Sequence, residues 1–135
     1  MTSKVVYTGG LHTIATHLRS GNSIETDAPT DNHGKGERFS PTDLVATALA
    51  ACIVTTIGIL APKIDITGAE CQVEKIMASN PRKIGEIVVT ISFPKSGPYT
   101  EEEKKQLEHI AITCPVHQSL HPDCKRTIIF NYPNP

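Results

Sequence analysis

The sequence predicts an α+β protein with one domain covering residues 1–135. Two kinds of observation support this prediction. Segments with strand signals and segments with helix start signals follow one another as strands, a helix, a hairpin, a helix and a last strand. No repeat, linker or low-complexity stretch divides the 135 residues. A chain of this length buries a moderate core as a single unit.

The first forty residues carry strand and loop signals. Residues 4–8 (KVVYT) and 11–18 (LHTIATHL) predict two strands joined through Gly9 and Gly10, and residues 22–29 (NSIETDAP) contain a third, short strand. Residues 30–40 (TDNHGKGERFS) are polar and rich in glycine, which predicts a loop. This loop is long enough to contribute to a functional site.

Residues 40–43 (SPTD) predict the start of a helix. Ser40 is the expected N-cap, Pro41 occupies the first helical position and Asp43 lies near the positive end of the helix dipole. Pro62 ends the helix. Residues 44–61 carry no charge, so the segment has the length of a membrane span. Three threonines and many alanines make it only mildly hydrophobic and no second such segment accompanies it, so we expect no membrane insertion.

A helix that is apolar on all sides in a soluble chain is surrounded by protein. A domain of 135 residues has little material to surround five helical turns. We therefore expect a second copy of the chain to provide part of the cover, in a homodimer.

The second half of the chain carries three strand signals and two helix signals. The expected strands are residues 69–79, 86–94 and 125–132, the first two separated by a turn at 80–85, and the expected helices are residues 100–112 and 114–120. Thr100 followed by Glu103 matches a capping box at the start of the longer helix.

Composition narrows the classes of function. The net charge is -1 and the pI about 6.6, so nothing attracts the chain to nucleic acid or to an anionic membrane. The first ten residues, MTSKVVYTGG, lack the apolar run of a signal peptide, so we expect a cytoplasmic protein. In a reducing cytosol its four cysteines are redox-active, metal-binding or simply buried. We expect no cofactor.

Cys52 lies in the middle of the apolar helix, with the small residues Ala48 and Ala51 beside it. The small neighbours leave room above the sulfur. The sequence is also compatible with a structural core cysteine at this position.

Cys114 differs in its setting because it precedes Pro115 at the first turn of a short helix. The helix dipole and the free N–H groups there stabilise a thiolate and lower the pKa of the thiol. The alternative is that Cys114 is a neutral cap. Cys71 and Cys124 are interpreted as structural.

A zinc site is the competing interpretation of the segment CPVHQSLHPDC. Its four potential ligands, Cys114, His117, His121 and Cys124, lie within eleven residues, and the two histidines are four positions apart. Zinc sites usually pair ligands from two turns separated by a longer insert, whereas here the Cys124 arm must fold straight back. We therefore expect no metal, with both histidines solvated or hydrogen bonded at the surface.

The two cysteine motifs together resemble those of the OsmC/Ohr family, which comprises the osmotically inducible protein C and the organic hydroperoxide resistance proteins. The segment FSPTDLVATALAAC, ending at Cys52, is followed some sixty residues later by CPVHQSL, beginning at Cys114. The resemblance covers nearly the whole chain and is specific because both motifs occur in order and at this separation.

The resemblance implies an OsmC-like fold, with antiparallel sheets wrapped around a central long helix in an intertwined homodimer. It also implies that Cys52 is the peroxidatic cysteine and Cys114 its resolving partner. The implied substrate is a small hydrophobic peroxide, and an external thiol or dithiol would be the reductant. The implied activity is thiol-dependent reduction of organic hydroperoxides in oxidative-stress defence. The alternative is an OsmC-like dimer that binds a small hydrophobic ligand or senses oxidation.

The chain departs from the family pattern at two positions. Hydroperoxidases of the family use an Arg on an early strand and a Glu at the start of the cysteine helix, where this sequence has Leu11 and Thr42. Asp43 supplies a carboxylate one position later. Without a cation, a cysteine in an apolar helix has a raised pKa. Arg38, just before the helix, is the first candidate for that cation; Arg19 and Lys35 are others.

Overall fold

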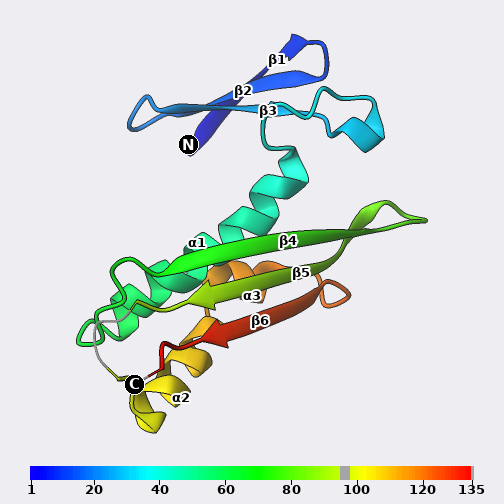
Figure 1. Ribbon diagram of the computed structural model, residues 1–135. Coiled ribbons are helices and arrows are strands. Elements are labelled where there is room, and N and C mark those ends of the chain that lie inside the picture. Colours follow the sequence, from blue (N-terminus) through cyan, green and yellow to red (C-terminus); the bar gives the residue numbers. More distant parts are fainter. Residues whose placement is uncertain (95–97, 135) are drawn as a thin grey trace. The chain divides into compact units, whose positions relative to one another are not determined.

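Two three-stranded sheets and one long helix make up most of the secondary structure, in agreement with the predicted α+β class (Figure 1). The computed structural model describes residues 1–94 and 98–134. By its internal contacts the chain divides into two compact units, residues 1–45 and 46–135. The expectation of a single domain stays a prediction.

The first unit contains an antiparallel sheet with the order β1-β2-β3. Its strands are β1 (Ser3–Gly9), β2 (His12–His17) and β3 (Ser23–Asp27), all of them predicted from the sequence. Gly9, Gly10 and Leu11 form the first turn with φ angles of 87°, 64° and 59°. The predicted polar loop follows β3 and contains one short 3-10 helix, η1 (Thr30–Asn32).

Helix α1 (Pro41–Leu60) begins and ends as the sequence predicts. Its start is held by a reciprocal pair of hydrogen bonds. The Ser40 hydroxyl accepts the N–H of Asp43 at 3.1 Å, and the Asp43 carboxylate accepts the N–H of Ser40 at 2.9 Å. By length and composition alone, α1 is apolar enough to cross a membrane, with a mean hydropathy of 2.1, a property it shares with core helices of soluble proteins.

Only one face of α1 is buried within this chain. The buried residues are spaced as one helical stripe: Ala46, Leu49, Ala50, Ile53 and Ile57. Near the end of the helix, Ile59 remains 68% exposed and Leu60 56%. The chain by itself therefore leaves much of its most apolar helix uncovered, and the expectation of a homodimer stays a prediction.

The second unit contains a sheet with the order β4-β5-β6. Its strands are β4 (Glu70–Ala78), β5 (Lys83–Ser92) and β6 (Lys125–Asn131). The predicted β4–β5 hairpin is confirmed, but its turn is shorter than expected because Ala78 already pairs with Lys83.

One pairing in this unit departs from the expected antiparallel sheets, since β6 runs parallel to β5. The connection between these strands contains two helices, α2 (Glu101–Ala111) and α3 (Pro115–Ser119). Such a connection returns the chain to the end where β5 began, which a parallel pairing requires.

The core of the second unit lies between its sheet and its helices. The buried stripe of α1 shares one hydrophobic cluster with Ile87, Val89 and Ile91 of β5 and with Leu107 and Ile110 of α2. Helix α2 starts with the predicted capping box, in which Thr100 and Glu103 exchange hydrogen bonds of 2.9 and 3.1 Å. Cys52 and Cys114 belong to this unit and contact this cluster.

Candidate active site

The short helix α3 begins at Cys114, as the sequence predicts. Cys114 is the N-cap in an extended conformation, and Pro115 occupies the first helical position. The sulfur of Cys114 accepts the N–H of His117 at 3.3 Å and is fully buried. The cap therefore fixes the Cys114 side chain.

Cys52 lies in the middle of α1 and is partly buried. Its sulfur is 3.8 Å from the hydroxyl oxygen of Thr56, one helical turn further on. It also accepts hydrogen bonds from the Val116 N–H and from the Cys114 thiol. Two cysteines that lie far apart in the sequence are thus in side-chain contact, and both are free thiols in this structure.

The environments of the two thiols shift their pKa values in opposite directions. Burial by itself raises the pKa of Cys52, but the hydrogen bonds from Val116, Cys114 and Thr56 stabilise the thiolate and bring the pKa below its ordinary value. Burial also raises the pKa of Cys114, and the neighbouring Cys52 sulfur adds to this, so its pKa stays above the ordinary value.

This result corrects two expectations. Cys114 was expected to have the lowered pKa because it opens a helix, and Cys52 a raised one because its helix is apolar. The structure reverses the order: the Val116 N–H lowers the pKa of both thiols, but the Cys114 thiol donates to the Cys52 sulfur, which lowers the pKa of Cys52 and raises that of Cys114. The arrangement can supply a thiolate at Cys52 with a neutral thiol at Cys114 in contact with it.

The two predicted supporting residues have defined partners within the first unit. The Asp43 carboxylate takes part in the capping of α1 described above. The Arg38 guanidinium pairs with the Glu25 carboxylate at 3.2 Å and donates to the carbonyl of Glu37 at 3.1 Å. The participation of Arg38 and Asp43 in the chemistry of Cys52 stays a prediction.

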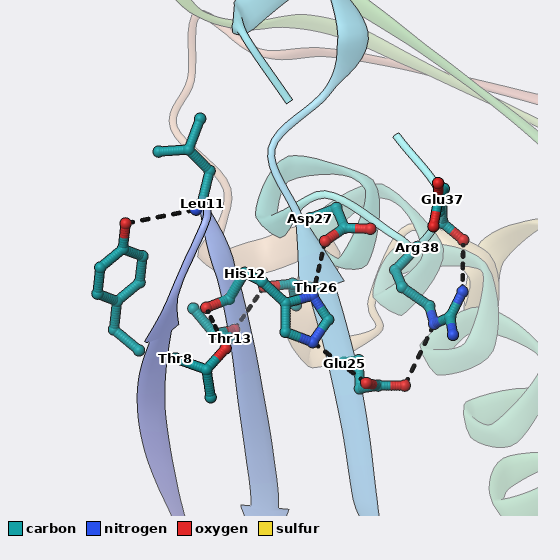
Figure 2. A network of polar contacts seen from close by, with 10 residues as sticks. Thr8, Leu11, His12, Thr13, Glu25, Thr26, Asp27, Glu37 and Arg38 are labelled. Carbon is teal, nitrogen blue, oxygen red and sulfur yellow. Dashed lines mark hydrogen bonds and ion pairs between the residues drawn. The ribbon is translucent and has the colours of Figure 1, made fainter. Parts of the chain in front are cut away.

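Arg38 belongs to a polar network that the sequence did not predict (Figure 2). His12 lies between two carboxylates, with Nδ1 2.6 Å from Asp27 and Nε2 3.1 Å from Glu25. The contact with Asp27 is the main cause that raises the pKa of His12. A cavity of about 330 Å³ borders this network and is lined in part by Gly9, Gly10 and Lys35.

This network could have been predicted only from the pairing register of β2 and β3. His12 faces Asp27 in the β2–β3 register, so both side chains lie on the same face of the sheet. Leu11, at the position of the family Arg, forms part of the neighbouring turn, and its N–H donates to the Tyr7 hydroxyl at 3.3 Å (Figure 2).

The proposed zinc ligands do not form a cluster. Among the residues that the structure describes, no three His, Cys, Asp or Glu side chains are grouped so that they could hold a metal ion. The Nδ1 of His121 accepts the N–H of Asp123 at 3.0 Å, a local contact. Burial raises the pKa of both Cys71 and Cys124, which keeps these thiols neutral.

A further cavity, of about 370 Å³, lies at the end of α1. It is lined by Val54, Thr55 and Gly58 of the helix and by residues 62 and 64–69 of the segment that follows. No cysteine lines it, so it is separate from the pair of thiols.

A comparison with models of protein families shows which family the chain belongs to. The model of the OsmC-like protein family matches residues 34–128, a range that contains both Cys52 and Cys114. The chain belongs to the OsmC-like family. This membership confirms the resemblance found in the sequence, and the comparison with curated proteins finds no match.

Solved structures of OsmC-like and hydroperoxide resistance proteins share this fold. A candidate osmotic-stress-induced and detoxification response protein from Psychrobacter arcticus is 48% identical, with a TM-score of 0.91 and coverage of 97% of this chain and 96% of that one. An organic hydroperoxide resistance protein OsmC from Legionella pneumophila is 19% identical, with a TM-score of 0.71 and 97% coverage of both chains.

A third solved structure with this fold carries a ligand. It is a candidate organic hydroperoxide resistance protein from Vibrio cholerae with captopril bound in one of its active sites, 17% identical with a TM-score of 0.69, covering 97% of this chain and 92% of that one. At this identity the likeness shows the fold.

Proposed function

We propose that this OsmC-like protein reduces organic hydroperoxides, with Cys52 as the peroxidatic cysteine and Cys114 as the resolving one. One observation carries the proposal: the Cys52 sulfur, whose pKa is lowered, accepts hydrogen bonds from the Val116 N–H and from the Cys114 thiol. A nucleophilic thiolate and the thiol that would condense with its oxidised form are therefore already in contact.

The chemistry balances with an external dithiol as reductant. The Cys52 thiolate attacks the terminal oxygen of the hydroperoxide, the O–O bond breaks, and the products are a sulfenic acid at Cys52 and an alkoxide, which takes a proton to become the alcohol. The Cys114 sulfur then displaces the hydroxyl from Cys52, which leaves as water with the thiol proton. The dithiol finally reduces the Cys52–Cys114 disulfide by thiol exchange and is itself oxidised to a disulfide.

The surroundings of the thiols support an alkyl hydroperoxide as the substrate class. Cys114 is part of the hydrophobic core cluster and Cys52 packs against it. An apolar surround contacts an alkyl group favourably and provides few groups that would bind hydrogen peroxide.

A homodimer is part of the proposal. The uncovered face of α1, including Ile59 and Leu60, is more apolar than a helix at a free surface usually is. Light scattering is expected to give twice the chain mass of 14.6 kDa at micromolar concentration. A monomer at that concentration contradicts this part of the proposal.

Peroxide consumption and disulfide mapping test the enzyme. Cumene hydroperoxide should be consumed when a dithiol is present, and brief oxidation should give a Cys52–Cys114 disulfide that leaves Cys71 and Cys124 reduced. Cys114→Ser should trap the sulfenic acid at Cys52, and Cys52→Ser should abolish consumption. Cys71→Ser is the matched control and should retain activity. A mapped bridge between other cysteines, or a Cys52 thiol that survives oxidation, rejects the proposal.

A second candidate is an OsmC-like dimer that senses oxidation without efficient turnover. Leu11 and Thr42 favour it, because they occupy the positions at which the resemblance calls for an activating Arg and Glu. For a sensor, one equivalent of hydroperoxide should form the Cys52–Cys114 disulfide, whereas sustained consumption with a dithiol should be absent. For the peroxidase, both should be observed.

A further inference from the structure

Helix α3 is too short to hold its own position. It has 5 residues, and an isolated helix of this length is unstable in water because the nucleating turn costs more free energy than its few hydrogen bonds return. Yet this turn carries Cys114 at its start and directs the Val116 N–H at the Cys52 sulfur. Contacts from outside the turn must therefore fix it.

Arg126 provides such a contact at the other end of the turn. One guanidinium nitrogen, Nη1, donates to the carbonyl of His117 at 3.1 Å and to the carbonyl of Leu120 at 3.3 Å. The last carbonyls of a helix lack partners within the helix, and a positive charge is favourable there. Arg126 satisfies two of these carbonyls at once.

Arg126 is itself held in place by the strand pairing of its backbone. It lies on β6, and its backbone pairs in register with Ile87 of β5, which is completely buried in the core. Burial is the main cause that lowers the pKa of His117, and the positive charge of Arg126 adds to it. The guanidinium therefore links α3 to a strand that is paired with the buried strand β5.

We propose that Arg126 is a positioning residue for the Cys52–Cys114 pair: by holding the carbonyl end of α3 against β6, it keeps Cys114 and the Val116 N–H in contact with the Cys52 sulfur. The catalytic importance of this role rests on the proposed function. The positioning itself is a property of the thiols and can be measured without a peroxide.

The matched control for Arg126 is its neighbour Lys125. The Lys125 side chain is 73% exposed and lies 3.9 Å from Glu86, away from α3. Lys125→Met removes the same unit of charge from the same strand as Arg126→Met does, but it leaves both carbonyls of α3 with their partner. The pair of variants therefore separates positioning from a general effect of charge.

The experiment measures alkylation of Cys52 by iodoacetamide as a function of pH, with the labelled peptide quantified by mass spectrometry. Arg126→Met should shift the pH profile of Cys52 upward and slow its alkylation at pH 7 on the order of tenfold, since the thiolate loses an aligned N–H donor. It should also slow formation of the Cys52–Cys114 disulfide. Arg126→Lys should restore most of the rate, because an ammonium group also donates to carbonyls at a helix end. Lys125→Met should match the unmodified protein.

Circular dichroism shows whether each variant folds. If Arg126→Met is unfolded, Arg126→Gln takes its place; its amide donates with a shorter reach, so Cys52 should react severalfold more slowly. A folded Arg126→Met or Arg126→Gln variant with the unmodified pH profile overturns the proposal, as does a Lys125→Met variant that is equally slow. If the unmodified protein does not consume peroxide but Arg126→Met still shifts the profile, the proposed function fails and the positioning role stands.

Discussion

The amide N–H of Val116 donates a hydrogen bond to the sulfur of Cys52, so the second residue of α3 stabilises a thiolate on α1. Pro115, the first residue of α3, has no N–H to donate. The next amide is that of Val116, which donates to Cys52, and the following one, of His117, donates to the sulfur of Cys114 at 3.3 Å. The Val116 amide also interacts with the Cys114 sulfur, so the first turn of α3 directs its free donors at both cysteines.

The hydroxyl of Thr56 is a further donor to Cys52, at 3.8 Å. Thr56→Val keeps the shape of the side chain but removes the donor, so we expect the pKa of Cys52 to rise and its alkylation at neutral pH to slow. Thr56→Ser keeps the hydroxyl and should leave the rate close to that of the unmodified protein. The pH profile of iodoacetamide labelling measures both variants, and equal rates for Val and Ser would remove Thr56 from the site.

The network around His12 predicts a pH dependence for the first unit. Asp27, the main cause, raises the pKa of His12, so the stability from this contact is full below about pH 6.5, the ordinary value, and is lost as the pH rises through the raised pKa. On the acid side, His12 lowers the pKa of Asp27, so the carboxylate contributes above about pH 4, and this is lost as the pH falls through the lowered pKa.

Nuclear magnetic resonance titration of the His12 ring proton tests this dependence. In Asp27→Asn the main contact that raises the pKa of His12 is neutralised, so the midpoint of the titration should move down toward the ordinary histidine value. Glu25→Gln should move it less, because the Asp27 bond is the shorter, at 2.6 Å against 3.1 Å. A midpoint that does not change in Asp27→Asn contradicts the assignment.

The buried stripe of α1 predicts a graded loss of stability. Ile57 is completely buried in the core of the second unit. Ile57→Val should lower the free energy of unfolding by about 0.5–1.5 kcal/mol and Ile57→Ala by about 2–5 kcal/mol, since the larger truncation leaves a larger cavity. Urea unfolding followed by circular dichroism measures the series. Equal losses for the two variants would mean that the core collapses around the site.

We expect no stoichiometric zinc in the purified protein. Cys114, His117, His121 and Cys124 are close in sequence, but the Cys114 sulfur is instead engaged by His117 N–H and Cys52, and the Nδ1 of His121 accepts the N–H of Asp123. Elemental analysis after purification without chelator measures this directly. One tightly held zinc per chain would favour the metal site over the pair of redox thiols.

Local signals in the sequence predicted the positions of the helices well. The starts of α1, α2 and α3 all depend on contacts between residues three positions apart, such as Ser40 with Asp43 and Thr100 with Glu103. Contacts between residues this close in sequence can be predicted from the residue types alone. The same holds for the identity of Cys52 and Cys114 as the residues of interest, since the two motifs around them indicate the OsmC-like family.

Contacts between residues that lie far apart in the sequence could not be predicted in this way. The parallel pairing of β6 with β5 follows from where the chain returns after α2 and α3, and nothing in the residues of β6 specifies it. The contact of His12 with Asp27 follows from the register of two strands, and a shift of one residue would separate their side chains onto opposite faces.

The sequence by itself determined the family and the helix boundaries and indicated the two cysteines of the candidate site, because these depend on residue types and on spacing along the chain. Only the tertiary structure decided which of the two thiols has the lowered pKa. Both cysteines are partly or fully buried, which raises the pKa of each, and the difference lies in the contact between them, which lowers the pKa of Cys52 and raises that of Cys114. The Cys114 thiol reaches Cys52 from a position more than sixty residues further along the chain, and a thiolate responds to the groups around it in space.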